Sequence, residues 1–539
     1  MSGKSLPDQP NLEQYKKQAR DLLRARAQGS RAALDRIAHH HPRFQNQPQD
    51  AVRSAPFHLA DAQLVIAREH GSESWPKFAR HIETLRLSSE VASLDDAASR
   101  FIEAACSPRH GHRSGTLEEA EMILAGYPHV AASSIYTAAT LADEATVRAF
   151  LARDPPSATA KGGPLGWDAL THLCFSRYLR LDRTRSEAFV RTARALLDAG
   201  ASPNTGWIEI IDHPNPRPVL EAAIYGAAGV AQHPGLTRLL LERGADPNDE
   251  ETAYHAIETY DNTVLKILLE SGKLNERSLS TALLRKCDWH DLDGLRLVLE
   301  RGADPNWMTL WGLTALHQSV RRDNRLAMIE LLLDYGADPA IPNREGQSAI
   351  WIAVRRGRAD ALDLFEKRGT PINFNGVDAL IVGCARNHQE TIRSILAAEP
   401  KLKSELIDQG GTLLAEFSGV GNLAGVRNLL DLGVSVTALY RGGDGYYGVA
   451  KASTALHVAA WRARPDVVKE LITRGAPVNA RDGQDRTALQ LAVKACVDSY
   501  WSGLRSPESV RALLEAGAST EGIELPTGYD EIDKLLRHR

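Results

Sequence analysis

The chain has few cysteines. Its 539 residues contain five, which are widely spaced and odd in number: Cys106, Cys174, Cys287, Cys384 and Cys496. This pattern argues against a disulfide framework and against a zinc site built from paired cysteines. Free thiols are typical of a reducing compartment, so we expect a cytoplasmic protein.

Long apolar runs and a strong charge excess are also absent. No window approaches about 18 uninterrupted apolar residues, so we expect no membrane span. The first residues, MSGKSLPDQPNLEQYKK, lack the apolar core of a signal peptide. The net charge is −4 with 24% charged residues, which does not favour a polyanion partner for the whole molecule.

Sequence motifs of common enzymes and metal sites are missing as well. We find no G-x-S-x-G, no HExxH and no paired CxxC. Several shorter clusters have a simpler structural interpretation as turns, loops or helix faces: HHHP (39–42), RHGH (109–112), KGGPLGW (161–167), CDWHD (287–291) and GVGNLAG (419–425). We therefore expect no catalytic residue, no cofactor and no bound metal.

One nine-residue pattern recurs along the chain. LLERGADPN (240–248) returns as VLERGADPN (298–306) and LLDYGADPA (332–340), and more loosely elsewhere. The recurring glycines are Gly200, Gly244, Gly272, Gly302, Gly336, Gly369, Gly433, Gly475 and Gly517. Their spacings fit a unit near 33 residues with insertions. Each glycine can take the left-handed conformation that ends a helix, and the residues after it turn the chain toward the next unit.

A second pattern precedes these glycines, as in GLTALHQSV (312–320) and STALHVAAW (453–461). The two patterns at this period resemble the ankyrin repeat over about 80% of the chain. The resemblance implies an all-α ankyrin-repeat α-solenoid of about 12 helix-pair repeats with finger loops. It also assigns His317 and His457 to hydrogen bonds that hold adjacent turns together.

The N-terminal region has a different pattern. Residues 11–86 predict four short helices in a compact bundle, with a polar loop at 45–56. They resemble a helical segment found ahead of bacterial ankyrin arrays and glyoxalase-like domains, which suggests a bacterial protein. We therefore predict a helical module over 1–90, a repeat array over 91–527 whose first two repeats are degenerate, and a capping helix over 528–539.

The basic N-terminal module raises an alternative, nucleic-acid binding. Residues 1–90 carry 14 Lys and Arg against 10 Asp and Glu. The basic residues lie on or near one predicted helix: Lys16, Lys17, Arg20, Arg24 and Arg26. Glu13 and Asp21 interrupt them, as on an ordinary solvated helix face, so we expect no nucleic-acid partner.

The enlarged fingers and first-helix ends carry aromatic and arginine side chains. In ankyrin proteins these positions line a concave surface, and such side chains are common at binding hot spots. The candidate partner-binding residues are Trp307, Trp311, Arg321, Arg355, Tyr440, Tyr446, Tyr447 and Trp461. The insertion at 497–508 adds Tyr500 and Trp501. For the rings, packing against neighbouring fingers remains open.

We therefore predict a non-catalytic, monomeric scaffold for a protein or peptide partner. The alternative is an enzyme or small-molecule binder that uses the enlarged loops at 205–217 and 438–452. A pocket that holds carboxylates with perturbed pKa values would favour this alternative.

Overall fold

The computed structural model describes residues 4–7, 10–45, 47–90, 93–106, 114–211, 216–498 and 506–537. The predicted loop at 109–112 and the rings of Tyr500 and Trp501 lie outside the described residues. The chain divides into two compact units, Met1–Leu274 (unit 1) and Asn275–Arg539 (unit 2). In the part of the chain described, no helix is long and apolar enough to cross a membrane.

Unit 1 begins with helices that share a hydrophobic core of their own, which includes Tyr15, Leu22, Ile37 and Phe78. The sequence predicts four helices here, but the structure has five. The additional helix occupies the segment 45–56, expected to be a loop, because Val52 is fully buried in this core. The helices are α1 (Leu12–Ala27), α2 (Arg31–His40), α3 (Gln49–Ser54), α4 (Leu59–Glu69) and α5 (Trp75–Glu90).

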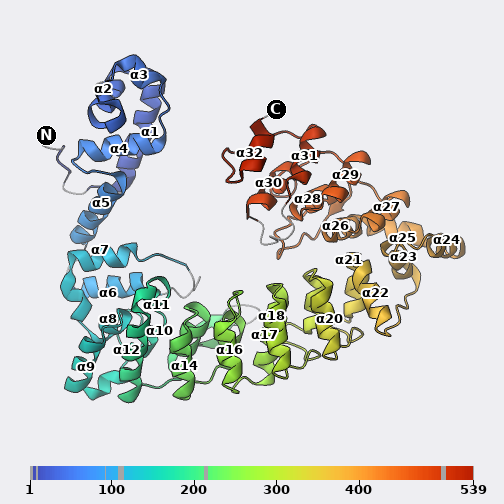
Figure 1. Ribbon diagram of the computed structural model, residues 1–539, viewed down its shortest axis with the longest axis horizontal. Helices are drawn as coiled ribbons and strands as arrows, with labels where there is room; N and C mark the ends of the chain where they lie inside the picture. The colour runs from blue at the N-terminus through green and yellow to red at the C-terminus, as the bar shows by residue number, and fades with distance from the viewer. Residues whose placement is uncertain are drawn as a thin grey trace. The chain divides into compact units, whose positions relative to one another are not determined.

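The rest of unit 1 is a stack of short antiparallel helix pairs (Figure 1). Two paired strands, β1 (Gly206–Ile211) and β2 (Arg217–Ala222), interrupt the helices. The helices are α6 (Leu94–Ala105), α7 (Glu118–Gly126), α8 (Ile135–Thr140), α9 (Glu144–Arg153), α10 (Ala169–Cys174), α11 (Arg177–Leu181), α12 (Ser186–Asp198), α13 (Ala223–Tyr225), α14 (Pro234–Glu242), α15 (Glu251–His255) and α16 (Thr263–Glu270).

Unit 2 continues the same design of helix pairs. A short second hairpin is formed by β3 (Leu439–Tyr440) and β4 (Ser453–Thr454). The helices are α17 (Glu276–Asp288), α18 (Leu292–Glu300), α19 (Ala315–Arg321), α20 (Leu326–Asp334), α21 (Ala349–Arg356), α22 (Ala359–Lys367), α23 (Gly376–Ala385), α24 (Gln389–Ala398), α25 (Leu402–Asp408), α26 (Gly410–Val420), α27 (Leu423–Asp431), α28 (Ala455–Trp461), α29 (Pro465–Thr473), α30 (Ala488–Asp498), α31 (Glu508–Glu515) and α32 (Asp530–Arg537). This architecture confirms the predicted all-α solenoid.

The inner helices of unit 2 do not follow one another in a simple row. Helix α21 packs against both α23 and α26, and α26 then packs against α28. Asn422 joins the two paths, because its side-chain amide donates 2.8 Å hydrogen bonds to the carbonyls of Gly357 and Ala385. As a result, the helices from α26 onward turn back toward α17 and α19 within unit 2 (Figure 1).

Local interactions explain why the sequence signatures form helix pairs. At the start of α19, the Thr314 side chain accepts a hydrogen bond from the His317 amide. In return, the His317 ring accepts one from the Thr314 amide. Just after the second helix of each pair, Gly302 and Gly336 have φ values of 89° and 88°, which residues with a Cβ atom rarely adopt. The repeat pattern predicts the left-handed conformation of these glycines.

The asparagine of the recurring GADPN pattern has a role that the sequence analysis missed. The side chain of Asn306 donates to the carbonyl of Gly336 at 2.8 Å and accepts from the amide of Asp338 at 2.8 Å. Asn204 makes the same pair of bonds to Gly244 and Asp246. This side chain therefore links the turn of one repeat to the turn of the next.

Candidate partner-binding site

The finger after Gly302 presents apolar side chains to solvent in unit 2. Trp307 and Trp311 are 41% and 42% exposed, and Leu310 between them is 38% exposed. The base of the finger is fixed, because Thr309 is buried and donates to the Leu313 carbonyl through both its amide (3.0 Å) and its hydroxyl (2.7 Å). The surface formed by Trp307, Leu310 and Trp311 is here called the tryptophan finger.

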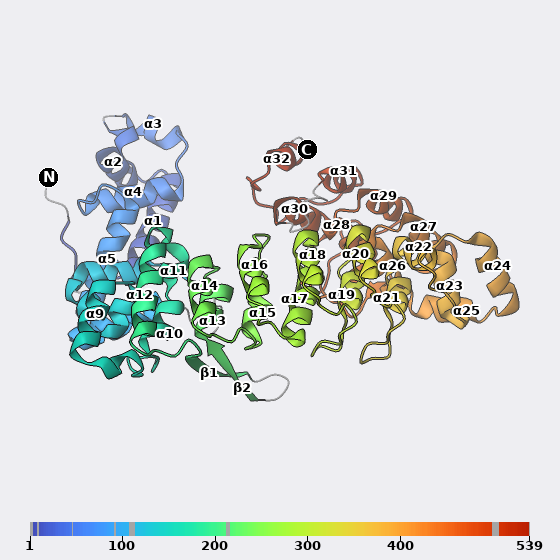
Figure 2. The same ribbon diagram turned by 60° about the horizontal axis from the view of Figure 1, so that its bottom comes forward.

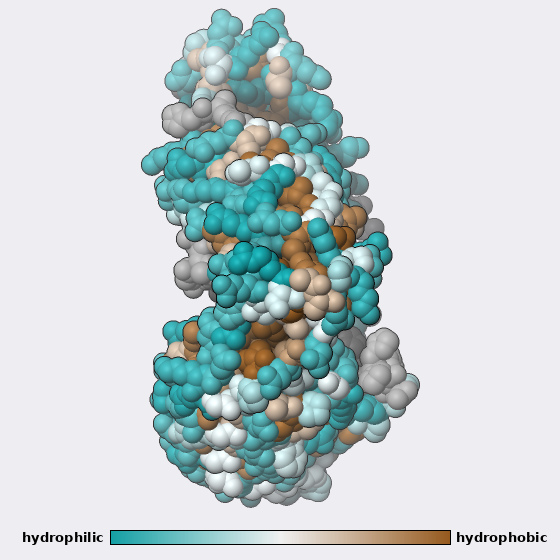
Figure 3. All heavy atoms as spheres, turned by 90° about the vertical axis from the view of Figure 1, so that its right-hand side faces the viewer, coloured by the Kyte–Doolittle hydropathy of each residue, from teal (hydrophilic) through white to brown (hydrophobic). Residues whose placement is uncertain are grey.

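The neighbouring finger supports the same surface. The Arg344 guanidinium donates a 2.7 Å hydrogen bond to the Leu310 carbonyl, and its backbone amide donates to the Gly312 carbonyl at 3.2 Å. A backbone held on both sides loses little conformational entropy when a partner binds. Seen from the side on which α24 lies, apolar side chains form strips between polar ones (Figure 3).

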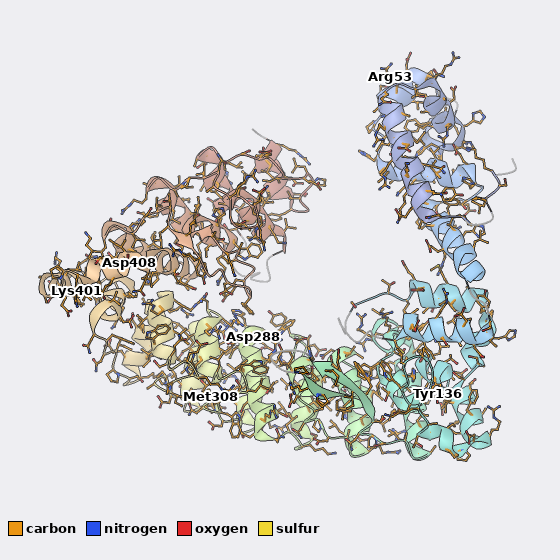
Figure 4. The ribbon with its side chains drawn as sticks, turned by 180° about the vertical axis from the view of Figure 1, so that it is seen from behind. Arg53, Tyr136, Asp288, Met308, Lys401 and Asp408 are labelled. Atoms are coloured by element: carbon orange, nitrogen blue, oxygen red, sulfur yellow. The ribbon has the colours of Figure 1, made fainter. Side chains whose placement is uncertain are left out.

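The tyrosines of the other enlarged finger have a different environment. Tyr440 and Tyr447 are 9% and 2% exposed. The Tyr440 hydroxyl donates to Glu416 at 2.7 Å, and the Tyr446 hydroxyl donates to the Asp288 carbonyl at 2.6 Å. Figure 4 shows Asp288 on the side of α17 that faces the C-terminal helices of unit 2. The finger at 438–452 therefore packs against the inner face of its own unit.

An ion cluster lies beneath this finger and is centred on Asp323. Its carboxylate lies 3.0 Å from Arg356, 3.0 Å from Arg462 and 3.9 Å from Arg358. The positive charges of these arginines hold the pKa of Asp323 well below its usual range, although burial acts in the opposite direction. The Tyr447 ring lies 3.7 Å below the Arg462 guanidinium, which is cation–π geometry.

A second acidic residue anchors the same finger. Asp288 accepts from Arg285, Arg322 and Gln318, each at 2.6 Å. The Arg322 guanidinium also lies 3.4 Å from the centre of the Tyr446 ring. The CDWHD cluster, to which Asp288 belongs, is therefore part of the packing between repeats, as its structural interpretation predicted.

These contacts change the set of candidate binding residues. Three of the candidates are tyrosines that pack against other residues of the same chain instead of facing solvent: Tyr440, Tyr446 and Tyr447. Trp461 is half-buried and donates from its indole to the Tyr447 carbonyl. Arg355 is half-buried and pairs with Asp378 at 3.0 Å. Trp307, Trp311 and Arg321 remain exposed.

The histidines of the repeat signature, and His41 of the histidine run, make structural contacts. His317 Nδ1 accepts from the Thr314 amide at 3.2 Å, and its Nε2 lies 3.1 Å from the Gln347 carbonyl, to which it donates. His457 makes the equivalent contacts to Thr454 and Ala480. His41 is buried beside Asp61. In the described residues, no group of three or more His, Cys, Asp or Glu side chains could hold a metal ion.

In unit 1, the enlarged loop at 205–217 forms part of the β1–β2 hairpin, which projects from the helices (Figure 2). Its inner face carries Trp207, which stacks on Trp167 with ring centroids 5.3 Å apart. Opposite Trp207 in the register is Glu221, which is 2% exposed. The outer face carries Ile208 and Ile210, which are 57% and 56% exposed.

Glu221 is a buried carboxyl group in acidic surroundings. Its buried Oε2 atom has no hydrogen-bond partner in the described part of the chain. Burial, together with the negative charges of Glu251, Glu209 and Asp249, raises its pKa to about 8. His255 lies between Glu251 at 3.2 Å and Glu258 at 3.0 Å, and these hydrogen bonds raise its pKa to about 9 against the effect of burial.

We expect Glu221→Gln to stabilise the protein at pH 8 and to have little effect at pH 4. At pH 4 the Glu221 carboxyl group is mostly protonated in both the folded and the unfolded chain. As pH rises above 4.5 the unfolded chain releases this proton first, so the stability of the wild-type protein falls until about pH 8. Urea unfolding at pH 4, 6 and 8 should show a gain for the variant that grows with pH to about 2–4 kcal/mol. A gain that does not depend on pH would contradict the assignment.

The stacked helix pairs with projecting fingers define the protein class: a repeat protein of the α-solenoid type. Family models identify the repeats. Residues 288–375 and 316–405 match the model for ankyrin repeats (3 copies), and residues 429–492 match the model for ankyrin repeats (many copies). These parts of the chain match ankyrin repeats, which generally mediate protein–protein interaction and are generally non-catalytic.

Curated relatives match parts of the chain. The ankyrin repeat domain-containing protein SAT10 of Stachybotrys chartarum is 29% identical over 209 residues, which is 38% of this chain and 9% of the relative. An L-asparaginase of Dirofilaria immitis is 32% identical over 120 residues, which is 21% of this chain and 20% of the relative. The chain thus spans a fifth or less of these relatives.

A solved structure, that of the human ASB11 ankyrin repeat domain, is 22% identical in sequence. The match covers 44% of this chain and 98% of that domain, with a TM-score of 0.20.

Proposed function

We propose that this protein is a non-catalytic scaffold that binds a protein or peptide partner through the tryptophan finger of unit 2. The observation that supports this proposal is the exposure of Trp307 and Trp311 on a finger whose backbone is held by hydrogen bonds from Thr309 and Arg344. Large aromatic side chains on a rigid support are typical of binding hot spots. Arg321, exposed at the end of α19, is a further candidate contact.

The same proposal includes the setting of the interaction. The five cysteines are free and buried, as suits a reducing compartment, so we place the protein in the cytoplasm. We propose a monomer that binds a protein and not nucleic acid. A bacterial source rests on the resemblance of the N-terminal module alone.

A second candidate function is a small-molecule site or an enzyme at the loops 205–217 and 438–452. The raised pKa of Glu221 favours it, since perturbed carboxyl groups gather at functional sites. Two observations oppose it. Asp249 is the neighbouring carboxyl group whose pKa burial raises to about 7. Its carboxylate accepts a hydrogen bond from the Thr252 amide at the start of α15, which is a structural role. The loop at 438–452 is occupied by contacts with its own unit.

The proposal is tested with peptides selected on the full-length protein from a random 15-residue display library. Replacing Trp307 and Trp311 together by alanine should weaken the selected peptides by more than 30-fold, which corresponds to the ~2 kcal/mol of a hot spot. The melting temperature should fall by much less than for a core residue, because Trp307 and Trp311 are 41% and 42% exposed.

Tyr335→Ala is the matched control. Tyr335 is 40% exposed in the same unit, at the end of α20, and is not one of the residues of the tryptophan finger. The Tyr335→Ala variant should bind the selected peptides as the wild-type protein does. Peptides that bind the double tryptophan variant with unchanged affinity would show that the finger is not the binding site.

A further inference from the structure

We propose that the free edge of β1 in unit 1 is a second binding site, independent of the tryptophan finger, that accepts an extended peptide as an additional strand. The peptide would alternate apolar residues, placed opposite Ile208 and Ile210, with arginine or lysine, placed opposite Glu209. Three features of the hairpin support this: its backbone edge, its outer apolar face and its inner acidic face.

The backbone edge follows from the strand register. The Ala223 amide donates to the Thr205 carbonyl at 2.8 Å, so these two residues form a hydrogen-bonded pair. Hydrogen-bonded and non-hydrogen-bonded pairs alternate along an antiparallel ladder. Ile208 and Ile210 therefore point their N–H and C=O groups away from β2. No further backbone hydrogen bond to either residue occurs in the part of the chain described.

The two edges of the hairpin are not equivalent. Pro218, opposite Ile210 in the register, has no N–H group, so it blunts the outward edge of β2. The edge of β1 keeps all its donors and acceptors. Exposed edges of this kind pair readily with an added strand, and this mode of recognition draws its affinity from main-chain hydrogen bonds.

The outer face of the hairpin supplies apolar contact. Ile208 and Ile210 are each more than half exposed, and Leu220, opposite Ile208, is 37% exposed. Isolated two-stranded hairpins gain stability from a third strand and from cover over an apolar face. An apolar side chain next to Ile208 and another next to Ile210 would extend this face.

The inner face selects the charge of the partner. Side chains on an added strand that lie opposite Glu209 point to the same face as Glu209 and Glu221. There, Glu221 is buried and its Oε2 has no hydrogen-bond partner among the described residues, and Glu251 and Asp249 are close enough to raise its pKa. A positively charged side chain complements this acidic face. The arginine side chain lies beside Glu209, and its positive charge acts on the acidic groups of this face without entering the packed core around Glu221.

The test uses a fluorescein-labelled peptide of seven residues, Thr-Val-Arg-Val-Arg-Val-Thr, and the same peptide with both arginines replaced by glutamate. Fluorescence anisotropy with the full-length protein at pH 8 should show at least 10-fold tighter binding of the arginine peptide. The Glu209→Gln/Glu221→Gln variant should reduce this preference to less than 3-fold. The control is Glu242→Gln, which removes an exposed carboxylate on α14 and should leave the preference unchanged.

Two variants of Ile210 separate backbone pairing from apolar contact. Ile210→Pro removes one outward donor and should weaken the arginine peptide by at least 10-fold. Ile210→Thr keeps that donor and should weaken it by less than 3-fold. The Trp307→Ala/Trp311→Ala variant should bind the arginine peptide as the wild-type protein does. The test of the β1 edge is therefore separate from the test of the tryptophan finger as a binding site.

Binding should also strengthen as pH rises from 6 to 9, because the arginine favours the ionised form of Glu221 over the protonated form. The charged groups facing Glu221 are Glu209 on β1, and Asp249, Glu251 and His255 at α15. Hydrogen exchange on the unchanged protein gives a direct readout: the arginine peptide should protect the amides of Ile208 and Ile210. Equal binding of the two peptides, or no protection at these amides, would overturn the proposal.

Discussion

Asp323→Ala is expected to lower the free energy of unfolding of unit 2 by about 3–5 kcal/mol, the usual effect of removing one partner from a buried ion cluster. Asp323 lies between Arg356, Arg358 and Arg462, and its side chain is 4% exposed. Without it, three guanidinium groups remain close together in a desolvated site. The effect is measured by urea unfolding of the full-length protein, with hydrogen exchange of the amides in α19 and α21 as the readout for unit 2.

The control for Asp323 is Asp334→Ala. Asp334 also pairs with an arginine, Arg368 at 2.6 Å, but its side chain is 49% exposed. Surface pairs contribute about 0–1 kcal/mol, so this variant should remain close to the wild-type protein. If the two aspartate variants lose equal stability, the cluster at Asp323 is hydrated and its buried description is wrong.

Tyr447→Ala is expected to destabilise unit 2 by about 3–4 kcal/mol, as for other buried aromatic residues. The ring is 2% exposed and packs on Arg462, and its hydroxyl donates to Asp323 at 3.4 Å. Thermal and urea unfolding measure this loss. Tyr447→Phe keeps the ring, removes the long hydrogen bond to Asp323 and should lose less than about 1 kcal/mol.

The two changes should not be additive. Tyr447 and Asp323 share Arg462, so the double variant should lose less stability than the two single variants together, by at least about 0.5 kcal/mol. Strict additivity would mean that the finger at 438–452 and the ion cluster are independent. Unchanged stability of Tyr447→Ala would mean that this finger is not packed as described.

Much of the repeat could be predicted from the sequence because its signals are local. The threonine cap at Thr314, its histidine partner His317 and the left-handed glycines each act over a few residues. The helix over Gln49–Ser54 was missed because its polar sequence has no helical pattern. Burial of Val52 and hydrogen bonds from Arg26 to the carbonyls of Val52 and Arg53 hold it against the N-terminal core.

The sequence by itself determined the repeat, its period, the helix pairs and the residues that end them, since these depend on backbone conformation and nearest neighbours. It also placed the aromatic residues on the fingers, but it did not separate exposed rings from buried ones. That distinction came only from the tertiary structure. Tyr446 meets Asp288, 158 residues earlier, because α26 packs on α21 and turns the following repeats back toward α17. Such a contact depends on the path of the whole unit, so the same residue type is buried in one finger and exposed in another.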